Sequence, residues 1–204
     1  MRCAQEAETA PGFDLWAPTY ASDAEELGWA APQQAAALLA PLLPALAARR
    51  PTPLRGLDAG CGTGLMAPLW REMGVTEVVG LDLSLGMLEE ARQLQFYQQL
   101  LHAPLDEPLP LADSAVDVIA CVGVLSYVRP EARGAALAEF IRLSSVGGLV
   151  AFSHRTDYLY AYRPPHECST EAKPCCWAAQ GGSGLGCAAG GARGEQSVAA
   201  QGTV

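Results

Sequence analysis

A carboxylate and a closely spaced set of glycines stand together in the segment Asp58-Ala59-Gly60-Cys61-Gly62-Thr63-Gly64. A glycine-rich loop lets a ligand approach the backbone closely, because no Cβ stands in the way. Two ligand classes compete for such a loop. A dinucleotide site has the pattern G-x-G-x-x-G, and here Leu65 occupies the position of the third glycine. The alternative is a ligand that carries an ammonium group.

The carboxylate of Asp58 discriminates between the two classes. It would repel the pyrophosphate of a dinucleotide, whereas it would form a charge-assisted hydrogen bond with an ammonium group. S-adenosylmethionine combines an ammonium, a carboxylate and a ribose in one molecule. The N-terminus of the helix expected after Gly64 adds a weak preference for the ligand carboxylate. The sequence therefore favours S-adenosylmethionine over NAD as the ligand of this loop.

A second carboxylate, Asp82, ends the next expected strand, 77–82. In dinucleotide folds an acid about 20 residues after the glycine loop binds the ribose hydroxyls, and we predict the same role for Asp82. The alternative is a plain negative charge near the N-terminus of the following helix, for which Ser84 is the expected cap. Leu83 and Met87 are predicted to flank the adenine, with ordinary core packing as the alternative.

The elements that position these residues alternate between strands and helices, which predicts an α/β fold with a doubly wound, mostly parallel sheet. The expected strands are 54–58, 77–82, 97–101, 115–122 and 149–153. The first expected helix begins near Asp23, after a capping box of Ser22 and Glu25. A second begins at Pro32, and we expect Pro41 and Pro44 to break it. The remaining helices are expected to begin at Leu65, Leu85 and Pro130. Ligands of such sheets bind at the carboxyl ends of the strands, where both acids fall.

The segment 58–64 resembles, without a gap, the first motif of class I S-adenosylmethionine-dependent methyltransferases. Asp82-Leu83-Ser84 followed by Gly86-Met87-Leu88 resembles their second motif. Further similarities lie in Trp16-Ala17-Pro18-Thr19-Tyr20, in Pro108-Leu109-Pro110 with Asp117-Val118-Ile119, and in Val146-Gly147-Gly148, where Val146 replaces the usual proline. The resemblance covers residues 13–162 and implies a Rossmann-like methyltransferase sheet.

The resemblance also implies a set of residues that bind S-adenosylmethionine. They are Tyr20, Asp58, Ala59, Gly60, Cys61, Gly62, Gly64, Asp82, Leu83, Met87, Val122 and Gly123. Neither the methyl acceptor nor a catalytic residue is specified. A base is needed only if the acceptor must lose a proton, and Ser126, Tyr127 and His154 are the candidates, with packing or surface roles as alternatives. Cys121, in a buried strand, is expected to be an inert thiol.

The sequence departs from the family pattern in two places. His102-Ala103-Pro104-Leu105 carries no acid where the family has an aspartate for the adenine amino group. The strand pattern also ends near Ser153, so the sheet is expected to lack the last two strands and to leave its fifth strand as an edge. The leading hypothesis is a methyltransferase with a small-molecule or protein acceptor. The alternative is a catalytically inactive or truncated S-adenosylmethionine-binding module.

Composition divides the chain into a flexible N-terminus (1–12), a methyltransferase domain (13–163) and a tail (164–204). The tail lacks apolar periodicity and is rich in glycine and alanine, so we expect it to be disordered. It contains Cys168, Cys175, Cys176 and Cys187, with His166 nearby. Their spacing fits no zinc ribbon or finger, and no metal is predicted.

Charge and hydropathy restrict the partners. A net charge of -9 and a pI near 4.7 argue against nucleic acid or an anionic membrane as partner. No uncharged apolar run is long enough to span a membrane, and residues 1–10 do not resemble a secretory signal. Seven cysteines at irregular spacings suggest free thiols in a reducing compartment, which predicts a cytoplasmic protein, with the nucleus also open.

Overall fold

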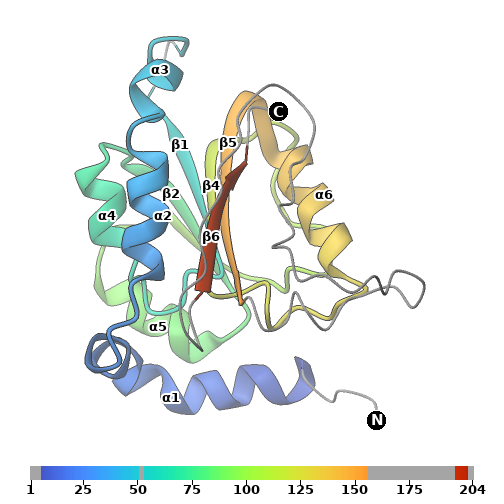
Figure 1. Cartoon of the computed structure of the whole chain (residues 1–204). Coiled ribbons are helices and arrows are strands. Elements are labelled where there is room, and N and C mark those ends of the chain that lie inside the picture. Colours follow the sequence, from blue (N-terminus) through green and yellow to red (C-terminus); the bar gives the residue numbers. More distant parts are fainter. Residues whose placement is uncertain (1–5, 51–52, 156–195, 202–204) are drawn as a thin grey trace, which may run out of the picture.

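The computed structural model describes residues 6–50, 53–155 and 196–201, which build one six-stranded sheet with helices around it (Figure 1). The strands are β1 (Arg55–Ala59), β2 (Glu77–Asp82), β3 (Gln99–His102), β4 (Val116–Cys121), β5 (Ser144–Arg155) and β6 (Gln196–Gln201). Their order is β3-β2-β1-β4-β5-β6; the first five are parallel and β6 is antiparallel to β5. The predicted doubly wound α/β sheet is therefore confirmed.

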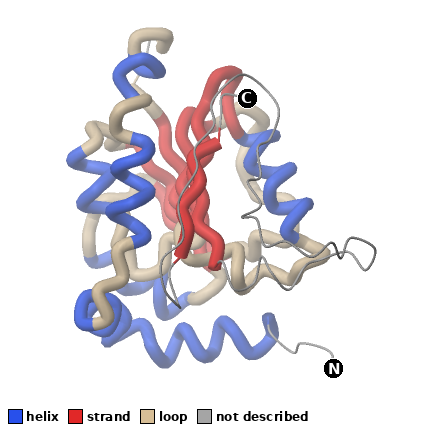
Figure 2. The backbone as a smooth tube through the Cα atoms, viewed as in Figure 1, coloured by secondary structure: helices blue, strands red, loops and turns tan. Residues whose placement is uncertain are grey.

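Helices cover both faces of this sheet, as the helix and strand colours of Figure 2 show. They are α1 (Glu6–Glu26), α2 (Ala31–Leu39), α3 (Leu43–Ala47), α4 (Ala67–Glu72), α5 (Leu85–Gln93) and α6 (Arg133–Leu143). On one face, Leu39 of α2 and Trp70 of α4 pack against Val118. On the other, Phe140 of α6 packs in a cluster with Ile119. Successive β4 residues thus bury opposite faces, as a strand covered on both sides requires.

The N-terminal helix differs from the expected one. The capping box predicted a start near Asp23, but α1 begins at Glu6 and continues through Pro11 and Pro18. The Ser22 hydroxyl donates to the carbonyl of Thr19 at 2.8 Å, a bond within the helix rather than a cap. A local capping signal was outweighed here by contacts that α1 makes with a distant helix.

Asp14 supplies the main polar contact between α1 and α5. Its Oδ1 accepts hydrogen bonds from the Ser84 hydroxyl at 2.5 Å and from the Gly86 N–H at 2.8 Å. The two backbones come so close that a Cβ at Gly86 would lie 2.9 Å from the Asp14 Cα. Ser84 is the N-cap of α5, as predicted, because its Oγ accepts from the Met87 N–H at 3.1 Å.

Most other boundaries agree with the expected elements, with differences at α6 and β5. The helix expected from Pro32 is interrupted between α2 and α3 at Pro41, as predicted, whereas Pro44 does not break a helix but lies in the first turn of α3. α6 begins at Arg133 rather than Pro130, and Ile141, which follows the helical spacing, is 57% exposed. β5 begins at Ser144, so that Gly147, with φ of 77°, lies within an irregularly paired strand rather than in a turn before it.

The edge of the sheet beyond β5 also differs from the expectation. β6 lies in the segment expected to be disordered and pairs with β5 from Val150↔Gln201 to Arg155↔Gln196, so β5 is not left as an edge. The remaining tail residues, including the four tail cysteines and His166, lie outside the described residues. Within the described ranges, no cluster of three potential ligands could hold a metal ion, and no helix is long and apolar enough to cross a membrane.

Candidate functional site

The carboxyl ends of three neighbouring strands bring the sequence motifs together. β1 lies between β2 and β4, with Asp58 paired to Gly80 on one side and to Ala120 on the other. Asp82 ends β2, and Val122 and Gly123 follow β4. The strand order reverses between β1 and β4, which is the place where open α/β sheets bind ligands.

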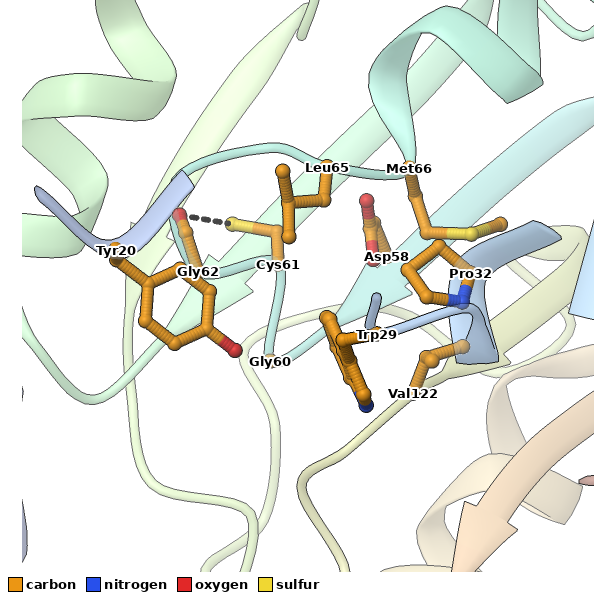
Figure 3. Close-up of a pocket in the computed structure, with 10 residues that line it drawn as sticks. All are labelled: Tyr20, Trp29, Pro32, Asp58, Gly60, Cys61, Gly62, Leu65, Met66 and Val122. Carbon is orange, nitrogen blue, oxygen red and sulfur yellow. Dashed lines mark hydrogen bonds between the residues drawn. The ribbon is translucent and has the colours of Figure 1, made fainter. Parts of the chain in front are cut away.

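A pocket lies at this edge and contains about 300 Å³ of space that includes open solvent (Figure 3). Its walls are formed by Tyr20, Trp29, Pro32, Asp58, Gly60, Cys61, Gly62, Leu65, Met66 and Val122. Six of these were predicted from the sequence. Leu65 and Met66 directly follow the motif loop, a signal that could have indicated them. Trp29 and Pro32 precede α2 or begin it, and no local motif marks either residue.

The three motif glycines have different structural roles. All adopt positive φ, at 77° for Gly60, 55° for Gly62 and 91° for Gly64. A Cβ at Gly60 would lie 2.2 Å from Val124, and one at Gly64 would lie 2.4 Å from Leu94. A Cβ at Gly62 would meet nothing within 4 Å. Packing therefore excludes a side chain at Gly60, and at Gly64 the end of the Leu94 side chain would have to move. At Gly62 the space is open and belongs to the pocket wall.

The loop is tied to β2 by backbone hydrogen bonds. The N–H groups of Gly60 and Cys61 both donate to the Leu81 carbonyl, at 2.6 and 2.8 Å. The Gly62 N–H donates to Oδ2 of Asp82 at 2.8 Å. The buried hydroxyl of Thr63 has no hydrogen-bond partner among the described residues. The loop is thus rigidly placed, and it retains one buried polar group that a ligand could satisfy.

Asp82 is held by the backbone on both of its oxygens. Oδ2 accepts from Gly62, and Oδ1 accepts from the Ser84 N–H at 2.9 Å. Burial raises the pKa of Asp82, although these hydrogen bonds act to lower it. Each carboxylate oxygen can accept a second hydrogen bond. Asp82 can therefore receive two hydroxyl donors side by side, which is the chemistry a ribose needs.

Asp58 is almost completely buried, with 2% of its surface exposed, yet it lines the pocket. Its Oδ2 accepts from the Tyr97 hydroxyl at 2.7 Å and from Trp70 Nε1 at 3.3 Å. Burial raises the pKa of Asp58 to about 7, and these two hydrogen bonds limit the rise. Asp58 is the one charged side chain among the lining residues. Sequence reasoning missed both donors, because neither belongs to a motif.

An aromatic cluster from α1 and the loops contributes two rings to the pocket wall. The cluster consists of Phe13, Trp16, Tyr20, Trp29 and Tyr127, with centroid separations between 4.8 and 6.4 Å. Tyr20 and Trp29 line the pocket (Figure 3). Burial raises the pKa of Tyr20 to about 12, so its phenol is neutral at physiological pH. Trp29 packs so closely on Gly123 that a Cβ there would lie 2.8 Å from the ring.

Six predicted binding residues do not line this pocket: Ala59, Gly64, Asp82, Leu83, Met87 and Gly123. The side chain of Met87 is 2% exposed, which agrees with core packing. The segment after β3 is tied back to β2, since the Ala103 N–H donates to the Asp82 carbonyl at 3.1 Å and His102 Nε2 lies 2.9 Å from the Leu83 carbonyl. The adenine contacts therefore stay predictions.

The candidate bases have no geometry that singles one out. Tyr127 is 43% exposed and packs edge-on against Phe13. Ser126 and His154 lie after β4 and within β5. Cys121 is fully buried, and burial raises the pKa of its thiol, which fits the expected inert role.

Residues 57–152 match the model of a methyltransferase domain. The chain is 43% identical over 97 residues to malonyl-[acyl-carrier protein] O-methyltransferase of Yersinia pestis, covering 48% of this chain and 35% of that protein. It is 36% identical over 146 residues to human methyltransferase-like protein 27, covering 71% of this chain and 57% of that protein. The chain thus spans between about a third and somewhat more than half of the length of these curated relatives.

Solved structures show the same fold at low sequence identity. One is the complex between the Haloferax volcanii Trm112 methyltransferase activator and the protein assigned as the methyltransferase, with a TM-score of 0.56 and 24% identity over 72% of this chain and 60% of that one. Another is a protein of Methanococcus maripaludis assigned as an S-adenosyl-L-methionine-dependent methyltransferase. It has a TM-score of 0.50 and 18% identity over 74% of this chain and 65% of that one.

Proposed function

We propose that this chain binds S-adenosylmethionine at Asp58 and Asp82 and transfers its methyl group to a small-molecule or protein acceptor, because residues 57–152 match the model of a methyltransferase domain and the relatives of the chain are methyltransferases. The observation that carries the proposal is the pair of acids at the ends of β1 and β2, with the glycine loop between them. Titration calorimetry with S-adenosylmethionine and S-adenosylhomocysteine tests the binding directly.

Three polar residues of the two strand ends and the motif loop fit the three polar parts of this ligand, and of these Asp58 lines the pocket. Asp58 presents a negative charge for the ammonium, and Asp82 offers two oxygens for the ribose hydroxyls. The unpaired hydroxyl of Thr63 is a donor for the carboxylate. The proposed binding residues are those that the motif resemblance implied, together with Trp29 and Leu65 from the pocket wall.

S-adenosylmethionine supplies a methyl group that is already activated by its bond to a sulfonium sulfur. The task of the protein is therefore to bind and orient the two reactants. Asp58 and Asp82 fix the two ends of the site, and the rings of Tyr20 and Trp29 exclude water from one side of it. If the acceptor must lose a proton, Ser126, Tyr127 and His154 remain the proposed candidates for the base.

Asp58→Asn separates this proposal from dinucleotide binding. The change preserves the shape of the side chain but removes the charge opposite the ligand ammonium. A charge-assisted hydrogen bond is worth about 1.5–3 kcal/mol, so the affinity for S-adenosylmethionine should fall about 10- to 100-fold in calorimetric titrations. If the loop bound a pyrophosphate instead, the same change would relieve repulsion and tighten NAD binding.

Both cofactors are therefore titrated against wild type and Asp58→Asn, with thermal unfolding as the control for folding. Tighter NAD binding by Asp58→Asn, together with no wild-type affinity for S-adenosylmethionine, would overturn the methyltransferase proposal and establish the dinucleotide alternative.

The acceptor and the subgroup are finer proposals. At subgroup level the chain resembles the methyltransferase-like protein of the Williams-Beuren syndrome region. The support for this assignment is the match to methyltransferase-like protein 27, which covers 71% of this chain at 36% identity, whereas the malonyl-[acyl-carrier protein] enzyme of Yersinia pestis covers 48% at 43% identity. A catalytically inactive or truncated S-adenosylmethionine-binding module is the second candidate, since no geometry singles out one of the candidate bases. Turnover of S-adenosylmethionine with a panel of acceptors, malonyl-[acyl-carrier protein] included, distinguishes an enzyme from such a module.

We also propose that residues 13–163 form the cofactor-binding domain and that the segment from 164 onward is dispensable for binding. Limited proteolysis of the full chain should cleave early between 164 and 195, because this stretch has little apolar sequence to bury. Mass spectrometry should then find a resistant core that ends near Arg163, whether the β6 fragment stays paired with β5 or is released, and this core should still bind S-adenosylhomocysteine. Protection of that stretch, stoichiometric zinc in it, or loss of binding on cleavage would contradict the proposal.

A further inference from the structure

The carboxylate of Asp58 is held by two side chains that lie outside the glycine motif. Trp70 comes from α4 and is fully buried; Tyr97 comes from the segment between α5 and β3. Both donate to the same oxygen, Oδ2, at 3.3 and 2.7 Å. Tyr97 is itself fixed, because its ring packs edge-on against Phe96 at 5.2 Å and lies against Gly64 and Gly80.

Two donors on one oxygen make the two oxygens of Asp58 chemically different. A carboxylate oxygen has two lone pairs, so two hydrogen bonds saturate Oδ2. When the acid is neutral, its proton therefore resides on Oδ1. A ligand ammonium also needs an oxygen with free lone pairs and must use Oδ1. The proton and the ammonium consequently compete for the same atom.

We propose that Tyr97 and Trp70 are positioning residues that reserve Oδ1 of Asp58 for the amino group of the ligand, so that binding displaces a proton from this oxygen to the solvent. The step balances: the neutral acid and the ammonium become a carboxylate–ammonium pair and one released proton. This inference rests on the proposed function, since it assigns to Asp58 the amino-acid end of S-adenosylmethionine.

The surroundings of Asp58 allow this exchange near neutral pH. Burial raises its pKa to about 7, the nearby Asp82 charge adds to the rise, and the Tyr97 and Trp70 hydrogen bonds oppose it. The other titratable groups that face Asp58 are Cys61, Cys121 and the Tyr97 phenol. Burial raises the pKa of all three, so they stay neutral in this range.

The first test compares two ligands across pH 5.5 to 7.5. S-adenosylhomocysteine carries the amino-acid end, whereas 5′-methylthioadenosine shares its adenine and ribose but lacks that end. Calorimetry with wild type should show the affinity for S-adenosylhomocysteine rising with pH, by up to about tenfold per unit below the pKa of Asp58. Titrations in buffers of different ionisation enthalpy should show release of close to one proton at the acidic end. Binding of 5′-methylthioadenosine should be nearly independent of pH, which also controls for titration of Asp82.

The second test removes one donor with Tyr97→Phe, which keeps the ring. The affinity for S-adenosylhomocysteine at pH 7 should fall about five- to tenfold, and the midpoint of its pH dependence should rise by about one unit. The affinity for 5′-methylthioadenosine should not change. If Tyr97 acts through Asp58, Tyr97→Phe should have no further effect in an Asp58→Asn background, as a double-mutant cycle would measure.

The outcomes separate the inference from the proposed function. Absence of S-adenosylhomocysteine binding by wild type overturns the proposed function itself. Wild-type binding with a flat pH profile and no proton release overturns the proton displacement, whatever the behaviour of the variant. Tyr97 has a packing role only if Tyr97→Phe lowers the affinity for both ligands by the same factor. The same conclusion follows if Tyr97→Phe lowers the affinity for S-adenosylhomocysteine as much in the Asp58→Asn background as in wild type.

Discussion

Gly62→Val is expected to abolish binding of S-adenosylmethionine. Gly62 has a φ of 55°, a region that β-branched residues rarely adopt, and its Cβ would point into open space at the pocket wall. The valine side chain would therefore occupy the volume that the ligand needs, and the backbone of the loop would also be strained. Calorimetry with S-adenosylhomocysteine should detect no binding at ligand concentrations that saturate wild type.

Gly74→Val is the matched control for backbone strain. Gly74 also has a positive φ, at 77°, and a Cβ there would meet nothing within 4 Å. It follows α4 rather than lining the pocket, so Gly74→Val should lower the melting temperature and leave ligand affinity intact. If Gly62→Val bound as tightly as wild type, the loop would not contact the cofactor. If both variants lost binding together with folding, the loss would reflect stability alone.

Asp82→Ala should weaken the binding of S-adenosylmethionine roughly 30- to 150-fold. The variant removes the acceptor of two ribose hydroxyl bonds in a partly buried site, a loss of about 2–3 kcal/mol. It also leaves the N–H groups of Gly62 and Ser84 without the acceptor that fixes the loop to the start of α5. Calorimetric affinities of wild type and variant, measured in the same buffer, give the difference directly.

The two acids can be told apart by the ligand used. Asp82→Ala should lower the affinities for 5′-methylthioadenosine and S-adenosylhomocysteine by similar factors, because both ligands carry the ribose. Asp58→Asn should lower the affinity only for S-adenosylhomocysteine, the ligand with the amino-acid end. Asp82→Asn retains one carbonyl acceptor, so its affinity for both ligands should lie between that of Asp82→Ala and that of wild type. Unchanged affinity of Asp82→Ala for both ligands would remove Asp82 from the site.

The sequence by itself determined the five parallel strands and the motif loop. Strands such as β2 and β4 are short apolar runs whose burial follows from local composition, and the boundaries predicted for β2 are those observed. Ser84 was identifiable as an N-cap because the signal lies within three residues of the bond it makes. Parallel pairing then places every strand-ending residue at one edge, so the sequence was enough to predict that Asp58 and Asp82 lie at the same edge of the sheet.

Only the tertiary structure showed what surrounds the two acids. Trp70 and Tyr97 reach Asp58 from 12 and 39 positions away, and Asp14 reaches Ser84 across 70. Such contacts leave no periodic pattern and no fixed residue spacing in the sequence, because they depend on how separate helices and strands pack. For the same reason a local capping box misplaced the start of α1, and no pattern indicated β6. Propensity and motif act over a few residues, whereas the protonation of Asp58 is decided by burial and by donors brought in from distant elements.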